Sequence, residues 1–246
     1  MKIAVAGKGG AGKTTVSGTV ARQLSRAGHP VLALDADTNP MLGISLGIGP
    51  EETYRLLTVR QGLDDGTIEH QHSVGALVEA FGVDAPDGVR LVVAMREAQV
   101  DPGCVCCGGI TPQQMLGELE DDEHRTVVCD MEAGVGAIVR TGKADVVLIV
   151  VEPSVKSIDV GARVAAAASA AEAEVIVVAN RVRGRDDLEA IRAEFGDREI
   201  AVVPEDPVIA RADVEGCAPM DLDPDAPGVS ALSSLAKRLA ALPAEV

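Results

Sequence analysis

Short apolar runs alternate along this chain with segments in which apolar residues recur at helical spacing. The runs predict β-strands at residues 2–6, 31–34, 89–94, 126–130, 145–151, 174–179 and 199–203. Helical spacing follows several of them, as in Val16, Val20 and Leu24 or in Leu188, Ile191 and Phe195. The run that ends at Val151 is almost wholly apolar, which is typical of a central parallel strand covered on both faces. The alternation predicts a single doubly wound α/β domain, residues 1–246, with a mostly parallel central sheet.

Three stretches need a separate interpretation. Met41 to Ile48 predicts a short helix, whereas residues 51–66 mix charges with glycine and show no clear period. The last helix carries its apolar face on Leu232, Leu235, Leu239 and Leu242. Because this helix has only two basic residues, we expect it to dock on the sheet rather than bind a membrane.

Composition narrows the class of protein. Hydrophobic residues make up 47% of the 246 residues but aromatic residues only 1%, so the core must consist of Val, Leu, Ile and Ala. The net charge of −16, without a basic run, argues against binding to nucleic acid or to an anionic membrane. The N-terminus leads straight into a strand, with no signal peptide and no stretch of about 18 apolar residues, so we expect a cytoplasmic protein.

A glycine-rich loop joins the first predicted strand to the first helix. Its sequence, Gly7-Lys8-Gly9-Gly10-Ala11-Gly12-Lys13-Thr14-Thr15, fits the phosphate-loop pattern G-x-x-x-x-G-K-[ST]. Glycine lets the backbone curl around a phosphate, and the helix N-terminus adds its positive dipole end. We expect Lys13 to bridge the β- and γ-phosphates and the Thr14 hydroxyl to hold Mg²⁺. The sequence therefore predicts a P-loop NTPase domain whose nucleotide is bound by Gly9, Gly10, Ala11, Gly12, Lys13, Thr14 and Thr15.

Aspartates follow two of the predicted strands. Asp35 and Asp37 come after the second strand, and Asp130 ends the run at 126–130. In open α/β sheets the residues just past the carboxyl ends of the strands line the ligand crevice. Carboxylates there can join the Mg²⁺ shell and orient water for attack on a γ-phosphate, and Asp130 fits the Walker B pattern. Asp35 or Asp37 can instead cap the next helix.

Three cysteines, Cys104, Cys106 and Cys107, lie within four residues of a glycine-rich loop. Cys-x-Cys places two sulfurs on the same side of an extended backbone, near enough to share one soft or borderline metal ion. Two thiolates fill only half of a four-coordinate shell, so the same loop of a symmetric partner can complete it. A homodimer around one metal ion is therefore one hypothesis, and chance thiols or a redox pair are the alternative.

Lys8 adds a second lysine that a plain phosphate loop does not need. With it, residues 8–14 read K-G-G-A-G-K-T, and the chain resembles the deviant Walker A ATPases, the MinD/ParA/nitrogenase-iron-protein superfamily. The resemblance implies that Lys8 reaches across a nucleotide-sandwich dimer to the partner's phosphates. It also implies that Asp37, in a D-x-D stretch followed by proline, positions the attacking water. An ATP-dependent homodimer is the expected assembly.

The same resemblance extends to the base of the nucleotide. Asn180 follows the sixth predicted strand, where the superfamily uses an asparagine for the base, and its side chain has both a donor and an acceptor for the adenine edge. The residues after the last strand, Pro204, Glu205 and Asp206, are expected to border the adenine.

Residues 126–160 further resemble the CooC group of accessory ATPases, which help insert nickel into carbon monoxide dehydrogenase. The motifs D-M-E-A-G after Walker B, V-V-E-P-S after the next strand and the G-C-x-C loop carry this resemblance. It implies that Cys104 and Cys106 of two subunits bind one Ni²⁺ or Zn²⁺ at the dimer interface. Cys107 stands where the group tends to have proline, and Val135-Gly136-Ala137 where it has an acidic residue and a histidine.

These features lead to an ATPase metallochaperone as the first hypothesis, with ATP hydrolysis coupled to release of a cysteine-bound metal. A ParA/MinD-type positioning switch that binds DNA or membrane is the alternative. A third hypothesis is an iron–sulfur reductase, which needs a second cysteine just after switch II. No cysteine lies between Met131 and Cys217, which counts against it.

Overall fold

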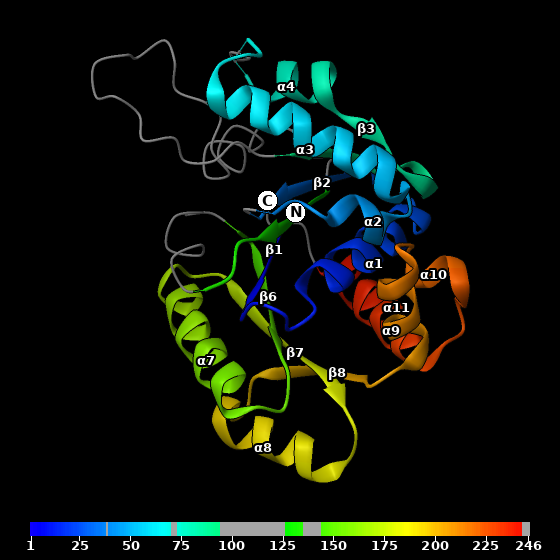
Figure 1. Ribbon diagram of the computed structural model, residues 1–246. Helices are drawn as coiled ribbons and strands as arrows, with labels where there is room; N and C mark the ends of the chain where they lie inside the picture. Colours follow the sequence, from blue (N-terminus) through cyan, green and yellow to red (C-terminus); the bar gives the residue numbers. More distant parts are fainter. Residues whose placement is uncertain (38, 70–72, 94–125, 135–143, 243–246) are drawn as a thin grey trace.

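One sheet of eight strands forms the centre of the part of the chain that the computed structural model describes, residues 1–37, 39–69, 73–93, 126–134 and 144–242 (Figure 1). The strands are β1 (Lys2–Gly7), β2 (Val31–Ala36), β3 (Val83–Asp84), β4 (Arg90–Val93), β5 (Thr126–Met131), β6 (Val146–Val151), β7 (Glu174–Val182) and β8 (Glu199–Pro204). Their order is β3-β4-β2-β5-β1-β6-β7-β8, and only the β3–β4 pair is antiparallel. The predicted doubly wound α/β fold with a mostly parallel sheet is confirmed.

Helices cover both faces of this sheet. They are α1 (Lys13–Arg26), α2 (Leu42–Leu46), α3 (Gly49–Asp65), α4 (Val74–Phe81), the 3₁₀ helix η1 (Pro86–Gly88), α7 (Val155–Ala170), α8 (Arg185–Phe195), α9 (Pro207–Glu215), α10 (Pro219–Leu222) and α11 (Pro227–Ala240). Buried residues of α7 and α8 pack in one apolar cluster on one face, and those of α1, α2 and α11 pack in a second cluster on the other. Figure 1 shows α7 and α8 on the opposite side of the sheet from α1 and α11.

The core is aliphatic, as the composition requires. Every residue of β6 from Val146 to Val151 is at most 2% exposed, which confirms a central strand covered on both faces. Phe195 at the end of α8 is the largest fully buried side chain of the described residues, and it adds an aromatic ring to an otherwise aliphatic cluster.

Two of the doubtful stretches are helices. The predicted short helix after Met41 is α2, and the stretch at 51–66 without a clear period is the long helix α3. The C-terminal helix α11 docks as expected, because Leu232, Leu235 and Leu239 are buried in the cluster that also contains α1. None of the helices in the described part of the chain combines the length and apolar character needed to cross a bilayer.

The topology gathers the candidate residues at one edge of the sheet. β1 lies between β5 and β6, and β5 also pairs with β2. In this register Asp35 of β2 is the direct neighbour of Asp130 of β5, and Asp130 in turn pairs with Val5 of β1, two residues before the phosphate loop. The carboxyl ends of these three parallel strands therefore lie side by side at one edge of the sheet.

Candidate nucleotide-binding site

The phosphate loop takes a shape that glycine alone permits at two positions. Gly7 has a φ of 148°, and a Cβ there would lie 2.3 Å from the Val150 carbonyl oxygen of β6. Gly12, the N-cap of α1, has a φ of 98°, and its Cβ would lie 2.3 Å from Nδ2 of Asn180. Gly12 offers no side chain to cap the first N–H groups of α1. A helix N-terminus left open in this way is suited to binding an anion such as phosphate.

Asp35 and Asp130 form a pair of buried carboxylates beside this loop. Asp35 is 2% exposed and Asp130 is fully buried. Oδ1 of Asp130 lies 3.0 Å from the Ser17 hydroxyl of α1, whereas Oδ2 has no hydrogen-bond partner of normal geometry among the described residues. A buried carboxylate oxygen without a donor is destabilising unless a ligand or water completes its shell. This orphaned oxygen marks the place where a cation fits.

The pKa values of both carboxyl groups reflect an excess of negative charge. Burial raises the pKa of Asp35, and the neighbouring charge of Asp130 raises it further. Burial likewise raises the pKa of Asp130; the Thr14 hydroxyl, the Lys13 ammonium and Ser17 oppose this rise, and Asp37 adds to it. Lys13 itself is only 6% exposed. The structure thus brings Lys13, Thr14 and the three aspartates together.

This donor set fits Mg²⁺. The groups are a hydroxyl and carboxylates, which are the hard oxygen ligands that Mg²⁺ prefers. Within the described residues no cluster of three His, Cys, Asp or Glu side chains is arranged to hold a metal ion by itself. Mg²⁺ commonly uses one or two carboxylates together with substrate phosphates, so a shell shared between Thr14, Asp130 and a nucleotide matches this arrangement.

Asp35 and Asp37 take different positions. Asp35 accepts hydrogen bonds from the N–H of Leu42, the first residue of α2, at 2.8 Å and from that of Asp37 at 3.3 Å. The helix-capping alternative is therefore confirmed for Asp35. Asp37 accepts a hydrogen bond from the N–H of Asn39 at 2.9 Å, and its carbonyl accepts one from the Arg60 guanidinium. Arg60, buried on α3, supports this loop and was not anticipated from the sequence.

Asn180 is tied to the phosphate loop. Its side chain is 7% exposed, and Nδ2 donates a hydrogen bond to the Ala11 carbonyl at 2.8 Å. Its Oδ1 accepts one from the N–H of Arg181 at 3.0 Å. Through the hydrogen bond to Ala11, strand β7 anchors the phosphate loop on the side where β6 lies. The predicted contact of Asn180 with adenine stays a prediction.

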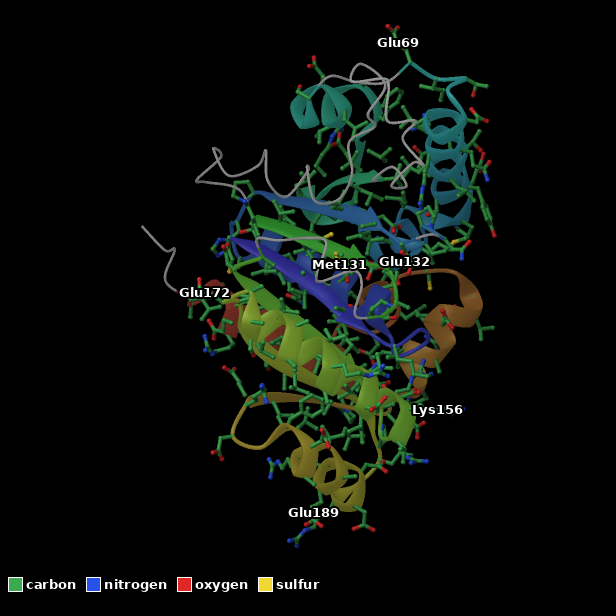
Figure 2. All side chains as sticks on the ribbon, turned by 90° about the vertical axis from the view of Figure 1, so that its left-hand side faces the viewer. Glu69, Met131, Glu132, Lys156, Glu172 and Glu189 are labelled. Atoms are coloured by element: carbon green, nitrogen blue, oxygen red, sulfur yellow. The ribbon has the colours of Figure 1, made fainter. Side chains whose placement is uncertain are left out.

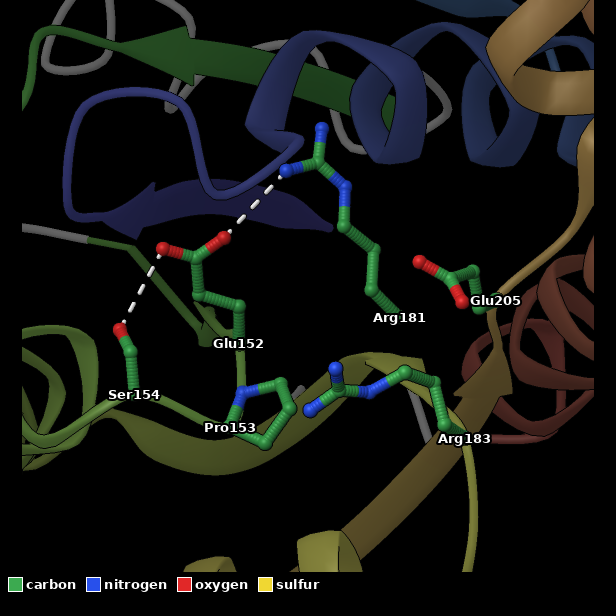
Figure 3. A pocket seen from close by; sticks show the side chains of 6 residues that line it. All are labelled: Glu152, Pro153, Ser154, Arg181, Arg183 and Glu205. Carbon is green, nitrogen blue, oxygen red and sulfur yellow. Dashed lines mark hydrogen bonds and ion pairs between the residues drawn. The ribbon is translucent and has the colours of Figure 1, made fainter.

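The three residues expected to border the adenine differ in their surroundings. Pro204 ends β8. Both carboxylate oxygens of Asp206 accept backbone hydrogen bonds, from Val208 at 2.8 Å and from Gly228 at 2.7 Å, so this side chain ties the starts of α9 and α11 together. Glu205 instead faces a pocket of about 250 Å³ whose other lining residues are Glu152, Pro153, Ser154, Arg181 and Arg183 (Figure 3).

Lys8, the second lysine of the loop, lies against its own subunit. Its Nζ donates to the Gly9 carbonyl at 3.2 Å and lies 3.7 Å from Oε1 of Glu152. Glu152 comes directly after β6, in the V-V-E-P-S motif. This contact could not be predicted from the sequence, because the two residues are far apart in the chain.

The predicted metal ligands Cys104 and Cys106 lie outside the described residues. The cysteines that the structure describes are Cys129 and Cys217. Cys129 is fully buried within β5. Burial and the nearby carboxylates of Asp130 and Asp35 raise the pKa of its thiol, so it acts as the small buried side chain that its position in a strand indicates.

Taken together, the strand–loop–helix, the buried aspartate near the end of β5 and the adjacent carboxyl ends of the parallel strands define a P-loop nucleotide-binding protein. The chain belongs to the CobQ/CobB/MinD/ParA nucleotide-binding family, whose model matches residues 2–220. It is 32% identical to the carbon monoxide dehydrogenase accessory protein CooC of Rhodospirillum rubrum over 91% of each chain.

Solved structures agree with this fold. The cell division ATPase MinD of Pyrococcus furiosus is 26% identical and superimposes with a TM-score of 0.71 over 97% of both chains. The septum site-determining protein MinD of Pyrococcus horikoshii, a complex with Mg-ADP, is 20% identical and superimposes with a TM-score of 0.67 over 97% of this chain and 95% of that one.

Proposed function

We propose that this protein is an ATP-hydrolysing homodimer that acts as a metallochaperone and helps mature a nickel enzyme such as carbon monoxide dehydrogenase. The observation that carries the ATPase part is the buried pair Asp35 and Asp130 beside Lys13, with one carboxylate oxygen left without a donor. Such an arrangement is costly in an empty site and becomes favourable when Mg²⁺ and a triphosphate enter it.

The residues of this chain divide the work on ATP between them. The loop N–H groups and Lys13 bind and neutralise the phosphates, and Asn180 and Glu205 face the base. Thr14 and Asp130 would hold Mg²⁺, with Asp37 in its shell. When bound, Mg²⁺ supplies charge that stabilises the developing phosphate oxyanions. Asp37 orients the attacking water, and Lys8 of the partner subunit adds a second positive charge to the phosphates.

The cargo of the proposed cycle is a metal ion. Cys104 and Cys106 of two subunits hold one Ni²⁺ or Zn²⁺, ATP closes the dimer, and hydrolysis with release of phosphate reopens it and frees the metal for the client. The support for this part is the similarity to the CooC protein of Rhodospirillum rubrum together with the Cys-x-Cys loop.

Anaerobic metal content per protomer, measured together with molar mass by light scattering, tests the proposal. Wild type and the Cys104→Ser/Cys106→Ser double variant are compared, each with and without ATP. We expect about one nickel or zinc ion per two wild-type chains, from the half-filled shell of each loop, and loss of that metal in the double variant. A protein that dimerises with ATP but binds no metal in either form contradicts the metallochaperone.

A ParA/MinD-type positioning switch is the second candidate, favoured by the similarity to MinD of Pyrococcus furiosus. It would use the same ATP dimer to bind DNA or a membrane. The net charge of −16 opposes both surfaces. ATP-dependent pelleting with anionic liposomes, or an ATP-dependent shift of duplex DNA in a gel, would favour this candidate over the metallochaperone.

A further inference from the structure

Glu152 has a fixed position at the carboxyl end of β6. Its N–H donates a hydrogen bond to the hydroxyl of Ser157, a buried residue of α7, at 3.1 Å. The Ser154 hydroxyl donates to Oε1 at 3.4 Å, and Nη1 of Arg181 donates to Oε2 at 3.3 Å. Figure 3 shows the side chains of Glu152 and Arg181 pointing toward one another, each from the end of a different strand. The carboxylate thus accepts hydrogen bonds from two residues, and the backbone of Glu152 is fixed by a third.

Arg181 adopts a conformation that serves this contact. Its φ of 56° lies in the left-handed region, which is uncommon for a residue other than glycine. The pairing of β7 with β8 is irregular between Ala179 and Val182, which brackets it. The chain therefore keeps a strained backbone at the point where a guanidinium meets Glu152, and strain of this kind is concentrated at functional sites.

The third neighbour of this carboxylate is Lys8. Its Nζ lies 3.7 Å from Oε1, and the side chains of Lys8 and Glu152 are 34% and 22% exposed. The ammonium group is therefore held over its own phosphate loop by one carboxylate and the Gly9 carbonyl.

We infer that Glu152 is a positioning residue for Lys8, holding this lysine on its own subunit in competition with the phosphates of a second subunit. The inference rests on the proposed ATP-dependent dimer, in which Lys8 crosses the interface. When Lys8 leaves, Glu152 keeps its hydrogen bonds from Arg181 and Ser154, so no buried charge is stranded and the exchange is reversible. Glu152 thereby sets how readily ATP drives two chains together.

The expected size of the effect follows from the exposure of the pair. A partly exposed ion pair contributes little, and a symmetric dimer breaks two of them. Removing the charge of Glu152 should tighten the ATP-bound dimer by about 2- to 30-fold in its dissociation constant.

Glu152→Gln tests this with little change of shape, because the amide oxygen can accept from Arg181 and the amide NH₂ can donate to the Ser154 hydroxyl. The dimer dissociation constant is measured by sedimentation with a non-hydrolysable ATP analogue. The control is Glu189→Gln on α8, which removes the same charge from an exposed pair with Arg185, far from the loop (Figure 2). We expect a tighter dimer for Glu152→Gln and an unchanged one for Glu189→Gln. A dissociation constant for Glu152→Gln that equals or exceeds that of the wild type overturns the inference but leaves the proposed function standing.

A second measurement, the reactivity of Lys8, can be made on the monomer and does not require the dimer to form. The rate at which a small acetylating reagent modifies Lys8 in the nucleotide-free monomer is followed by mass spectrometry. Loss of the contact should speed this reaction about 2- to 5-fold in Glu152→Gln, and an unchanged rate contradicts it. A wild type that binds the analogue and stays monomeric refutes the proposed dimer, and with it the competition, whatever the acetylation rates are.

Discussion

The two ends of α1 each bring a basic residue together with two aspartates, but they differ in how the charges are balanced. At the N-terminal end Lys13 lies near Asp130, which is the direct strand neighbour of Asp35. At the C-terminal half the buried Arg22 binds Asp87 of η1 at 2.6 Å and Asp221 of α10 at 2.8 Å. Arg26 adds a second positive charge to Asp87 at 2.9 Å.

The pKa values show what this difference means. Partial burial raises the pKa of Asp87, but hydrogen bonds from Arg26 and Arg22 outweigh it, and the pKa ends below its ordinary value. At the other end burial raises the pKa values of Asp35 and Asp130, and repulsion from Asp130 adds to the rise for Asp35 as repulsion from Asp37 does for Asp130. Charges balanced within the chain indicate a structural role, whereas a buried surplus of one sign is typical of a site that binds a ligand of the other sign.

The sharpest test of this contrast is Lys13→Met. Removing the ammonium takes away a charge-assisted contact to the phosphates, so ATP affinity should fall at least about 30-fold. The free energy of unfolding should fall less in Lys13→Met than in Arg22→Met, because the aspartates near Lys13 can take up protons. Calorimetric titration with Mg-ATP and thermal unfolding measure the two effects. Wild-type affinity in this variant would refute the phosphate site.

Arg22→Met is the counterpart at the other end. It leaves Asp87 with Arg26 alone and Asp221 without its buried partner, and we expect a loss of about 2–3 kcal/mol in the free energy of unfolding. Arg26→Met is the matched control, since Arg26 is 42% exposed and its pair should contribute less than about 1 kcal/mol. Denaturant titration distinguishes them, and equal losses in the two variants would show that burial of Arg22 does not matter.

The candidate site was predictable from the sequence wherever it depends on residue types at a fixed spacing along the chain. The phosphate loop, the strand ending in Asp130 and the aspartates after β2 follow from residue types at fixed spacing. The chain does not encode its long-range contacts in this way. Glu152 meets Lys8, and Ser17 meets Asp130, only because parallel strands bring distant residues to one edge.

The helix α3 shows a second limit. The buried side chains of Thr53, Leu56, Arg60 and Leu63 follow a regular helical spacing, but Thr53 and Arg60 are polar. Hydrophobic periodicity cannot find a helix whose inner face includes a guanidinium bonded to a loop carbonyl. A buried polar residue interrupts the apolar pattern on which prediction depends, and here that residue, Arg60, ties α3 to the Asp37 carbonyl.

A smaller effect is expected for Asp130→Asn, with the opposite sign from Arg22→Met. Relief of the buried charge should raise the free energy of unfolding of the nucleotide-free protein by about 1–2 kcal/mol. The same variant should lose most of the additional stability that Mg-ATP gives to the wild type. Asp145→Asn at the opposite end of the sheet, whose carboxylate accepts the Lys2 N–H, should give no such gain. Destabilisation of nucleotide-free Asp130→Asn would contradict a surplus of negative charge.

The smallest expected effect concerns the contribution of Asp87 to stability at acidic pH. Asp87 has a folded pKa below its ordinary value of 3.8, so its contribution is present above that value and is lost as the pH falls through the folded pKa. Asp87→Asn should therefore be less stable than wild type by about 1 kcal/mol near neutral pH, and the difference should shrink below about pH 4. Urea titrations of both proteins across this range measure it. A difference that stays constant with pH would mean that Asp87 contributes through packing, and the charge balance at this end of α1 would then rest on Asp221 alone.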